Sequence, residues 1–268
     1  MKLSIIGGGT MGEAVLSGVL GQAVAAPGDV TVSDVAPARL DHLRQTYGVG
    51  VTSDNIAAVR GAQIVVIAIK PQHLAETMAS IRGGFEAKQT ALSIVAGATI
   101  RTLTSGLGHQ AVIRAMPNTP GQIGQGVTAW MATPAVDQGQ RDAATSVLSA
   151  LGKTVELTDE NLLDVATALS GSGPAYVFLF IEALVEAGVH LGMSRELATE
   201  LAVQTVRGSG TMAIESDLGP GALREKVTSP GGTTAEAMRA FEEGGFRSVV
   251  MSAVVAAYEK AKLLGKEG

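Results

Sequence analysis

Cysteine is absent from this chain of 268 residues, and aromatic side chains make up only 3% of it. The missing thiols exclude disulfides, zinc sites built on thiolates and cysteine nucleophiles. Because aromatics are scarce, alanine, valine, leucine and isoleucine must fill the core. With hydrophobic residues at 46%, the chain is long and apolar enough to fold into two packed domains.

Basic charge is also in short supply. The formal net charge is -5 and no cluster of Lys and Arg stands out, so a nucleic-acid partner is not expected. The apolar stretch between Lys2 and the first glycine is too short for a signal peptide. The most apolar helix candidate, Pro174–Leu191, contains Glu182, Glu186 and His190, which argue against a membrane span. We therefore expect a soluble, cytoplasmic protein that has no contact with membranes.

The same three ionisable residues recur every four positions, a spacing that is also found in metal sites. Without cysteine or a second histidine nearby, a polar stripe on an amphipathic helix explains Glu182, Glu186 and His190 better. We expect no metal.

The first half of the chain alternates short apolar runs with helical stretches. Continuously apolar runs of this length are typical of strands buried on both faces. The predicted strands are Lys2–Ile6, Val30–Ser33, Gln63–Ile69, Ala91–Val95, Ala111–Ala115, Val127–Met131 and a short one near Thr154–Leu157. The predicted helices are Met11–Gly21, Pro37–Tyr47, Gln72–Ile81 and Asp137–Leu151. This alternation predicts an α/β fold with a doubly wound, mostly parallel sheet.

From Asp159 onward the patterns indicate helices alone, so we place a domain boundary near Thr158. Residues 1–158 are predicted to form the sheet domain, and residues 159–268 an all-helical domain. The helices expected there are Asp159–Leu169, Pro174–Leu191, Arg195–Ser216, Ala222–Val227, Thr234–Glu243 and Phe246–Leu264. One side of the last helix carries Val249, Val250, Ala253, Val254 and Ala257. We expect a second subunit to cover that side.

A glycine-rich turn follows the first predicted strand. Gly7, Gly9 and Gly12 match the pattern G-x-G-x-x-G, and Thr10 and Met11 lie in the first turn of the next helix. Glycine lets the backbone turn tightly and approach a pyrophosphate, which the unpaired N–H groups of the helix start then bind. Thr10 and Glu13 also match a capping box, which would start a helix without any ligand. In its strand–turn–helix context, the motif predicts a dinucleotide site.

The second predicted strand ends at Ser33 and Asp34, 22 residues after Gly12. An acid at this place usually binds the ribose hydroxyls and repels a 2′-phosphate, which favours NADH. Alternatively, Ser33 and Arg39 hold a 2′-phosphate while Asp34 turns away, or Asp34 caps the helix that begins at Pro37. The cofactor is therefore NADH or NADPH.

Two further strand ends carry polar or rigid residues. Ala68 closes one strand and leads into Lys70 and Pro71, and Lys70 is suited to neutralise phosphate. The strand Ala111–Ala115 leads into the rigid loop Met116–Pro117–Asn118. Ligands of such sheets bind at the carboxyl ends of the strands, so both segments are predicted to lie in the cofactor site.

The helical half contains a tight loop, Thr228–Thr234, with the sequence TSPGGTT. Thr233 and Glu236 match a capping box, so the plain interpretation is a well-capped turn between helices. The N–H groups of a helix start also bind a carboxylate well. Hydroxyls in the loop are suited to a small polar ligand.

Five motifs in order resemble those of pyrroline-5-carboxylate reductases over nearly the whole chain. They are GGGTMG, AIKPQ at Ala68–Gln72, RAMPNTP at Arg114–Pro120, LSGSGPAYVF at Leu169–Phe178, and TSPGGTT followed by Gly244–Arg247. The resemblance implies a Rossmann domain, a dimer built from the helical domain, and often a larger assembly of dimers. It also implies reduction of L-1-pyrroline-5-carboxylate, an imino acid, to L-proline in the last step of proline biosynthesis.

The resemblance also implies roles for particular residues. Ser229, Gly232, Thr233 and Thr234 would line the substrate, with Thr234 facing its ring nitrogen. Asn55 would contact the adenosine side of the cofactor, and Met116 and Asn118 would lie near the nicotinamide. Many relatives have Asn-Arg after the second strand for a 2′-phosphate, where this chain has Asp34-Val35.

Two alternatives remain at this point. Another reductase with a Rossmann and a helical domain, of the β-hydroxyacid dehydrogenase type, typically depends on a lysine in the helical region, and no matching motif surrounds Lys226. A non-catalytic dinucleotide sensor would have no need of the TSPGGTT loop.

Overall fold

The computed structural model describes residues 1–267, with side chains as far as Gly265. Contacts between residues divide the chain into two compact units. The first contains Met1–Ser172 together with the residues from Ala256 onward, and the second contains Gly173–Val255. The boundary expected near Thr158 stays a prediction.

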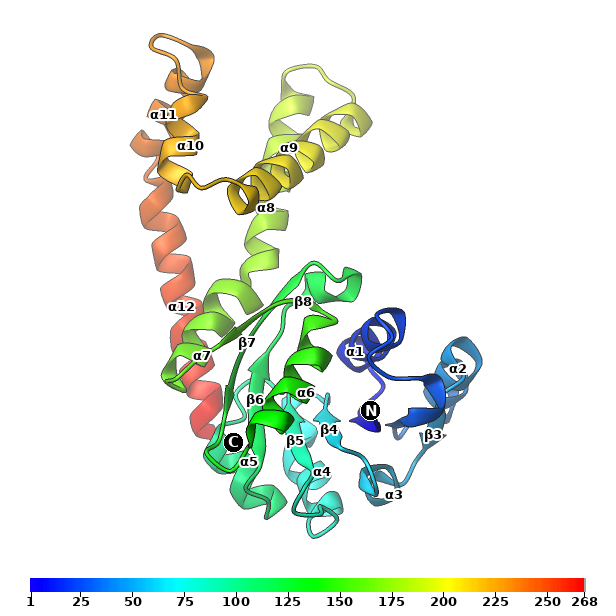
Figure 1. Ribbon diagram of the computed structural model, residues 1–268. Coiled ribbons are helices and arrows are strands. Elements are labelled where there is room, and N and C mark those ends of the chain that lie inside the picture. Colours follow the sequence, from blue (N-terminus) through cyan, green and yellow to red (C-terminus); the bar gives the residue numbers. More distant parts are fainter. Residues whose placement is uncertain (268) are drawn as a thin grey trace. The chain divides into compact units, whose positions relative to one another are not determined.

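An eight-stranded sheet organises the first unit (Figure 1). Its strands are β1 (Leu3–Ile6), β2 (Val30–Ser33), β3 (Gly50–Thr52), β4 (Ile64–Ile67), β5 (Thr90–Ser93), β6 (Val112–Met116), β7 (Gly126–Ala132) and β8 (Gly152–Glu156). They lie in the order β3-β2-β1-β4-β5-β6-β7-β8, and β6 with β7 is the antiparallel pair among otherwise parallel neighbours. The predicted doubly wound, mostly parallel sheet is confirmed.

Helices cover both faces of this sheet. They are α1 (Thr10–Gly21), α2 (Pro37–Tyr47), α3 (Asn55–Val59), α4 (Leu74–Ile81), α5 (Ile100–Leu107), α6 (Gln138–Ser149) and α7 (Asn161–Ala166), with short turns η1 (Pro27–Asp29), η2 (Pro71–His73), η3 (Thr119–Ile123) and η4 (Thr167–Gly171). Alternate side chains of β4 enter different cores: Ile64 and Val66 pack with α1 and α6, whereas Val65 and Ile67 pack with α4 and α5. Burial on both faces explains why β4 is apolar throughout.

Three elements were not predicted from the sequence. Strand β3 has three residues and begins with Gly50, and helix α3 has five, so neither shows a measurable period. Helix α5 contains two threonines and a glycine, which are typical of loops. Its ends are nonetheless marked, because Thr99 accepts a hydrogen bond from Thr102 N and Gly108 ends the helix with φ 64°.

The two predicted capping boxes, Thr10 with Glu13 and Thr233 with Glu236, are wrong. Gly9 caps α1 and Gly232 caps α11 (Thr233–Glu243), and neither helix start is capped by a side chain. The first-turn N–H groups of α1 and α11 therefore keep their capacity to bind a ligand.

The second unit consists of helices. They are α8 (Gly173–His190), α9 (Arg195–Glu215), α10 (Pro220–Lys226), α11 and the first part of α12 (Phe246–Glu267). Helices α8 and α9 pack closely around Val185, Ala198 and Ala202. Phe180, Phe241 and Phe246 bring α8, α11 and α12 together, with ring centroids 5.3–6.5 Å apart.

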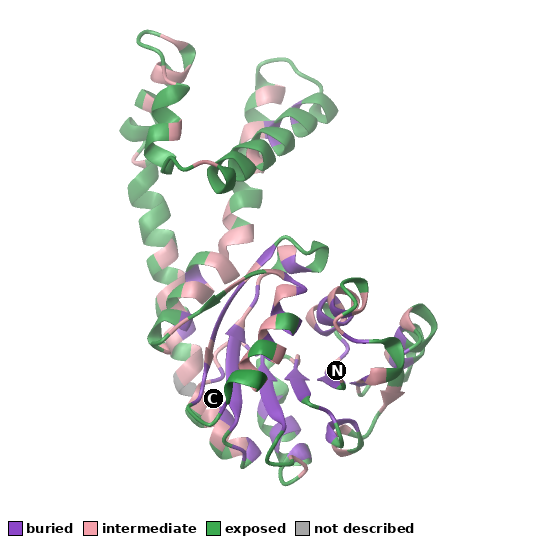
Figure 2. Ribbon diagram, in the orientation of Figure 1, coloured by how far each residue is buried: buried purple, intermediate pink, exposed green. Residues whose placement is uncertain are grey.

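Most of this unit is exposed in the single chain, whereas the strands of the sheet are largely buried (Figure 2). The helical stretch Asn161–His190 is long and apolar enough to cross a membrane by length and composition alone, with a mean hydropathy of 1.5. Core helices of soluble proteins meet the same criterion. The ionisable side chains of Glu182, Glu186 and His190 argue against a span.

Candidate functional site

A pocket of about 350 Å³ opens at the carboxyl ends of β1, β2 and β4. This is where ligands bind in doubly wound sheets, and the volume lies in the range of ligand pockets. Seven of the predicted cofactor residues line it: Gly7, Gly9, Ser33, Asp34, Asn55, Ala68 and Lys70. The structure thus brings residues from four separate segments of the sequence to one pocket.

The glycines at this edge are required by close backbone contacts. Gly7 has φ +98°, and a β-carbon there would lie 2.6 Å from the carbonyl oxygen of Ala68. A β-carbon at Gly12 would lie 1.9 Å from the carbonyl oxygen of Gly7. At Gly9, in contrast, a β-carbon would meet no atom within 4 Å. The turn is therefore closely packed at Gly7 and Gly12 and open at Gly9, beside the N–H groups of Thr10 and Met11. This arrangement leaves room for a pyrophosphate.

Asp34 is held at the mouth of the pocket by two backbone hydrogen bonds. Gly8 N donates to Asp34 Oδ2 at 2.8 Å, and Ala36 N donates to Asp34 Oδ1 at 2.9 Å. Ser33, next to it, is buried and donates its hydroxyl proton to Asn55 Oδ1. Asn55 in turn donates to Ser80 Oγ at 3.0 Å. The end of β2 is therefore a preformed hydrogen-bonded edge.

Sequence reasoning missed the wall that α4 contributes. His73, the N-cap of α4, and Thr77 and Ser80 within that helix line the pocket from one side, together with Glu76. Their spacing of four and three residues fits one helical face, so the periodicity after Lys70 contained the signal. Pro71 begins η2 directly after Lys70 and fixes the path of the chain into α4 without lining the cavity itself.

Met116, Pro117 and Asn118 follow β6 and have a structural function in this unit. Asn118 accepts from Val127 N at 2.9 Å and donates to the carbonyl oxygen of Ser170 at 3.1 Å. A β-carbon added at Gly171 would lie 2.8 Å from the terminal methyl group of Met116. The loop therefore holds η4, a π-helical turn, and such turns are frequent at functional sites. A contact with nicotinamide stays a prediction for this loop.

Glu13 anchors a polar cluster on the other side of the glycine turn. Its carboxylate accepts from Arg39 and from Tyr47 Oη at 3.0 Å, and lies 3.1 Å from His42 Nε2. Burial raises the pKa of Glu13, but these hydrogen bonds, above all that of Arg39, outweigh it and leave the pKa below its ordinary value. Thr10, Glu13 and Arg39 line a separate hollow of about 470 Å³.

The four predicted substrate residues lie in the helical unit. Ser229 precedes Gly231, which has φ +69°, and Thr233 and Thr234 open α11. A β-carbon at Gly232 would lie 2.4 Å from Ser229 Oγ. Only glycine therefore lets this hydroxyl lie against the start of α11. The substrate contacts of these residues stay a prediction.

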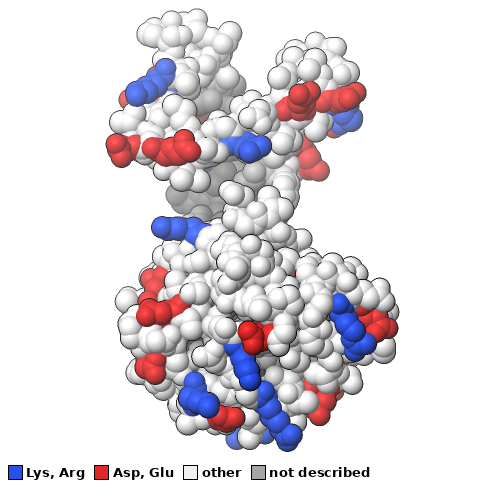
Figure 3. Space-filling view, turned by 45° about the vertical axis from the view of Figure 1, so that its right-hand side comes forward, with Lys and Arg blue, Asp and Glu red and all other residues white. Residues whose placement is uncertain are grey.

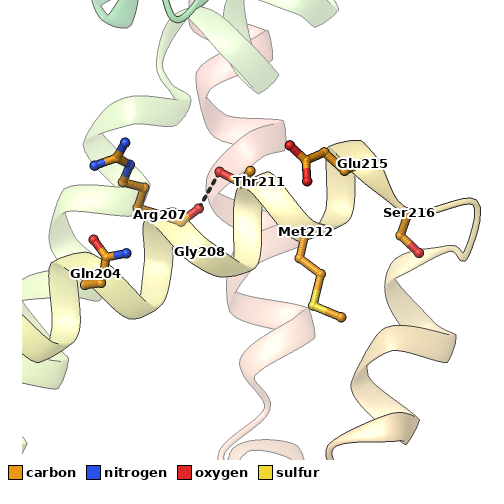
Figure 4. A pocket seen from close by; sticks show the side chains of 7 residues that line it. All are labelled: Gln204, Arg207, Gly208, Thr211, Met212, Glu215 and Ser216. Atoms are coloured by element: carbon orange, nitrogen blue, oxygen red, sulfur yellow. Dashed lines mark hydrogen bonds between the residues drawn. The ribbon is translucent and has the colours of Figure 1, made fainter.

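One face of α9 carries a second hollow of about 580 Å³ (Figure 4). The labelled side chains come from α9 and its end, and Thr211 donates its hydroxyl proton back to the carbonyl oxygen of Arg207 at 3.0 Å. A hollow lined by a single exposed helix lacks the convergent polar groups of a ligand site. We assign it no ligand.

On the face shown in Figure 3, acidic and basic side chains are scattered among mostly uncharged surface. No group of three or more His, Asp or Glu side chains suited to a metal occurs among the residues that the structure describes.

A doubly wound sheet with a glycine turn, a fixed acid after β2 and a pocket at the strand ends defines a dinucleotide-dependent oxidoreductase. Comparison with known proteins agrees. Residues 2–97 match the family model "NADP oxidoreductase coenzyme F420-dependent". Residues 160–264 match "Pyrroline-5-carboxylate reductase dimerisation". The chain is also 42% identical over its full length to a pyrroline-5-carboxylate reductase, so it belongs to the pyrroline-5-carboxylate reductase family, and the match to a dimerisation model supports a homo-oligomer.

Similarity extends over the full length. The pyrroline-5-carboxylate reductase of Synechocystis is 42% identical, covering 100% of this chain and 99% of its own. A crystal structure of the Plasmodium falciparum enzyme, with NADP bound, has a TM-score of 0.89 at 32% identity and covers 99% and 98%. A Coxiella burnetii pyrroline-5-carboxylate reductase structure has a TM-score of 0.91 at 36% identity and covers 98% of both chains.

Proposed function

We propose that this chain reduces L-1-pyrroline-5-carboxylate to L-proline, the last step of proline biosynthesis, with hydride from NADH or NADPH. The pocket at the ends of β1, β2 and β4 carries this proposal, because its glycine turn and fixed acid match what a dinucleotide needs. Full-length similarity to reductases of this name supports the choice of substrate.

The cofactor residues fall into three groups. Gly7, Gly9, Thr10, Met11 and Gly12 would surround the pyrophosphate. Ser33, Asp34 and Asn55 would form the adenosine side, with Ala68, Lys70 and Pro71 along the next strand end. Met116, Pro117 and Asn118 would position the nicotinamide end, either directly or through the turn η4 that they hold.

The start of α11 would bind the substrate. Its uncapped first-turn N–H groups, together with the hydroxyls of Ser229 and Thr233, are suited to the carboxylate. Gly232 leaves room for Ser229 there. Thr234 Oγ1 would accept a hydrogen bond from the N–H of the protonated ring nitrogen and so orient the C=N bond.

Little acid–base chemistry is needed, because a protonated imine is already a good electrophile. The bound nicotinamide supplies a hydride to the imine carbon, the C=N bond becomes a C–N single bond, and the ring nitrogen keeps its proton. The protein's contribution is then mainly to position the two reactants and exclude water.

The assembly we propose is a dimer through the helical unit, and light scattering measures whether these dimers associate into larger assemblies. The protein would work in the cytoplasm on a small molecule, without nucleic acid or membrane partners.

Purified protein mixed with NADH or NADPH and L-1-pyrroline-5-carboxylate tests the activity. We expect loss of the nicotinamide absorbance only when this imine is present, with proline as the product. Turnover of β-hydroxyacids with the oxidised cofactor, in place of the imine reaction, would support the hydroxyacid dehydrogenase alternative. Saturable cofactor binding without any turnover would support a sensor.

A further inference from the structure

The end of β2 determines whether a 2′-phosphate fits beside the ribose of a bound dinucleotide. Asp34 is the acid at this place, and hydrogen bonds from Gly8 N and Ala36 N occupy one oxygen each. Turning Asp34 away would break both bonds and leave Gly8 N without its partner. The carboxylate is therefore fixed where it accepts ribose hydroxyls and repels a phosphate.

Neither Ser33 nor Arg39, the two neighbours that could bind a 2′-phosphate in spite of Asp34, is free to do so. Ser33 is fully buried, and its hydroxyl proton is donated to Asn55 Oδ1. Arg39 donates to the carbonyl oxygen of Gly8 and to Glu13. Arg39 also lines the hollow beside Glu13 and does not line the dinucleotide pocket. Its charge is thus neutralised on the far side of the glycine turn.

The basic side chains that line the pocket belong to a different wall. Among the described residues that line it, Lys70 and His73 follow β4. Strand β1 separates β4 from β2, and neighbouring strands lie about 5 Å apart, so β2 and β4 are about 10 Å apart. Directly after Asp34 comes Val35, which is 90% exposed and uncharged. The β2 side therefore presents one fixed negative charge without a partner cation for a phosphate.

We propose that this site selects NADH over NADPH, and that selectivity has two parts: the fixed Asp34 and the sequestration of Arg39 by Glu13. This inference rests on the proposed function, since it concerns the same cofactor pocket. Asp34 acts directly on the ligand, whereas Glu13 is a positioning residue that acts through Arg39.

Isothermal titration calorimetry with NAD⁺ and with NADP⁺, in the absence of substrate, measures the selectivity independently of turnover. We expect the wild-type chain to bind NAD⁺ at least about tenfold more tightly, by a Coulombic preference that shrinks as salt is raised. Asp34→Asn should tighten NADP⁺ binding and weaken NAD⁺ binding. Combining Asp34→Asn with Val35→Arg should invert the preference, because the exposed position gives an arginine access to the 2′-phosphate.

Glu13→Gln tests the second part of the proposal. It should free Arg39 and lower the ratio of the NADP⁺ dissociation constant to the NAD⁺ dissociation constant. Tyr47→Phe is the matched control, because it removes a hydrogen bond to the same carboxylate and leaves the Arg39–Glu13 pair in place. Its ratio should equal that of the wild type.

The outcomes separate the inference from the function on which it rests. Equal or tighter binding of NADP⁺ by the wild type would overturn the selectivity while leaving a dinucleotide reductase. A ratio that does not move in Glu13→Gln would remove the part assigned to Glu13. Failure of the folded wild type to bind either nucleotide would defeat the cofactor assignment itself, and the selectivity with it.

Discussion

Gly12 lies where the first turn of α1 comes closest to the loop before it. A β-carbon at this residue would lie 1.9 Å from the carbonyl oxygen of Gly7, so Gly12→Ala must push the helix away from the turn. We expect it to weaken nucleotide binding by more than about tenfold, measured by calorimetry on folded protein. Gly21→Ala at the other end of α1 meets open space and is the control. Normal binding by Gly12→Ala would show that the close approach is not needed.

Thr234 is the side chain with the most specific chemical role in the proposal. Thr234→Ala should remove one hydrogen bond to the substrate nitrogen, worth about 1–3 kcal/mol, which is about 5- to 150-fold in kcat/KM. Steady-state kinetics with the imine measure it. Thr199→Ala, which removes a hydroxyl that donates to the carbonyl oxygen of Arg195 on α9, should leave the kinetics unchanged. Unaltered kinetics in Thr234→Ala would remove this residue from the site.

The site features that could be predicted from the sequence depend on residues close together in sequence, and those that were missed depend on residues far apart in sequence. Gly7, Gly9 and Gly12 lie within one turn, and close backbone contacts require glycine at Gly7 and Gly12, so a local sequence pattern marks this turn. Gly8, which donates to Asp34, and Glu13, which binds Arg39, each lie 26 positions from their partner in sequence. Such pairs form only when α2 packs beside the start of α1, which no local pattern contains. For that reason Glu13 was assigned to a cap that the fold does not form.

At the scale of elements, Glu13 connects α1 to α2 through Arg39, His42 and Tyr47. Because folding lowers its pKa below the ordinary 4.5, this carboxylate contributes stability that is fully present above that value. The contribution is lost as the pH falls through the folded-state pKa. Glu13→Gln should therefore be less stable than the wild type at pH 7, and the gap should narrow as the pH drops below about 4.5.

Urea unfolding over a pH series measures this gap. Glu200→Gln, an exposed glutamate of α9, is the control and should show a gap near zero throughout. A gap for Glu13→Gln that stays constant from neutral to acid pH would mean that the cluster does not depend on its charge.

Helices and strands were predicted correctly where both faces of the element are buried. The prediction failed where contacts with distant parts of the chain, and not the local hydrophobic pattern, determine the structure. Strands β1, β2 and β4 are apolar because both faces are covered, and they were found within two residues at either end. The sequence predicted two separate helices here, Asp159–Leu169 and Pro174–Leu191, but Asn161–His190 is one helical stretch. Proline in the first turn of α8 needs no N–H partner, and the π-helical turn η4 precedes it. Asn118 and Met116 stabilise that turn from another part of the chain.

On the scale of the whole molecule, the two units differ in the size of their buried hydrophobic cores. The sheet unit buries large side chains on both faces. Within the described part of the helical unit, Val185, Ala198 and Ala202 form the buried core. So small a core does not stabilise a domain alone. Three of the five phenylalanines in the chain cluster in the helical unit. They stay partly exposed, so they add little to the buried core of this unit.

Helix α12 shows what a partner must cover. Val249 is 64% exposed, Val250 43%, and Ala253 is exposed one turn further on. An apolar stripe of this kind marks a protein–protein interface, and the match of residues 160–264 to a dimerisation model agrees with that. Replacing Val249 and Ala253 together by aspartate would bury two unpaired carboxylates in the proposed interface, a strongly unfavourable change.

We expect the double variant Val249→Asp, Ala253→Asp to be monomeric by light scattering at micromolar concentration, where the wild type is a dimer or a multiple of one. Its melting temperature should fall and lose part of its dependence on protein concentration, because association stabilises the folded wild type by mass action. Ile123→Asp, at an apolar residue of the sheet unit that is 77% exposed, is the control and should keep the wild-type mass. A double variant that retains the wild-type mass would place the subunit contact elsewhere than on this side of α12.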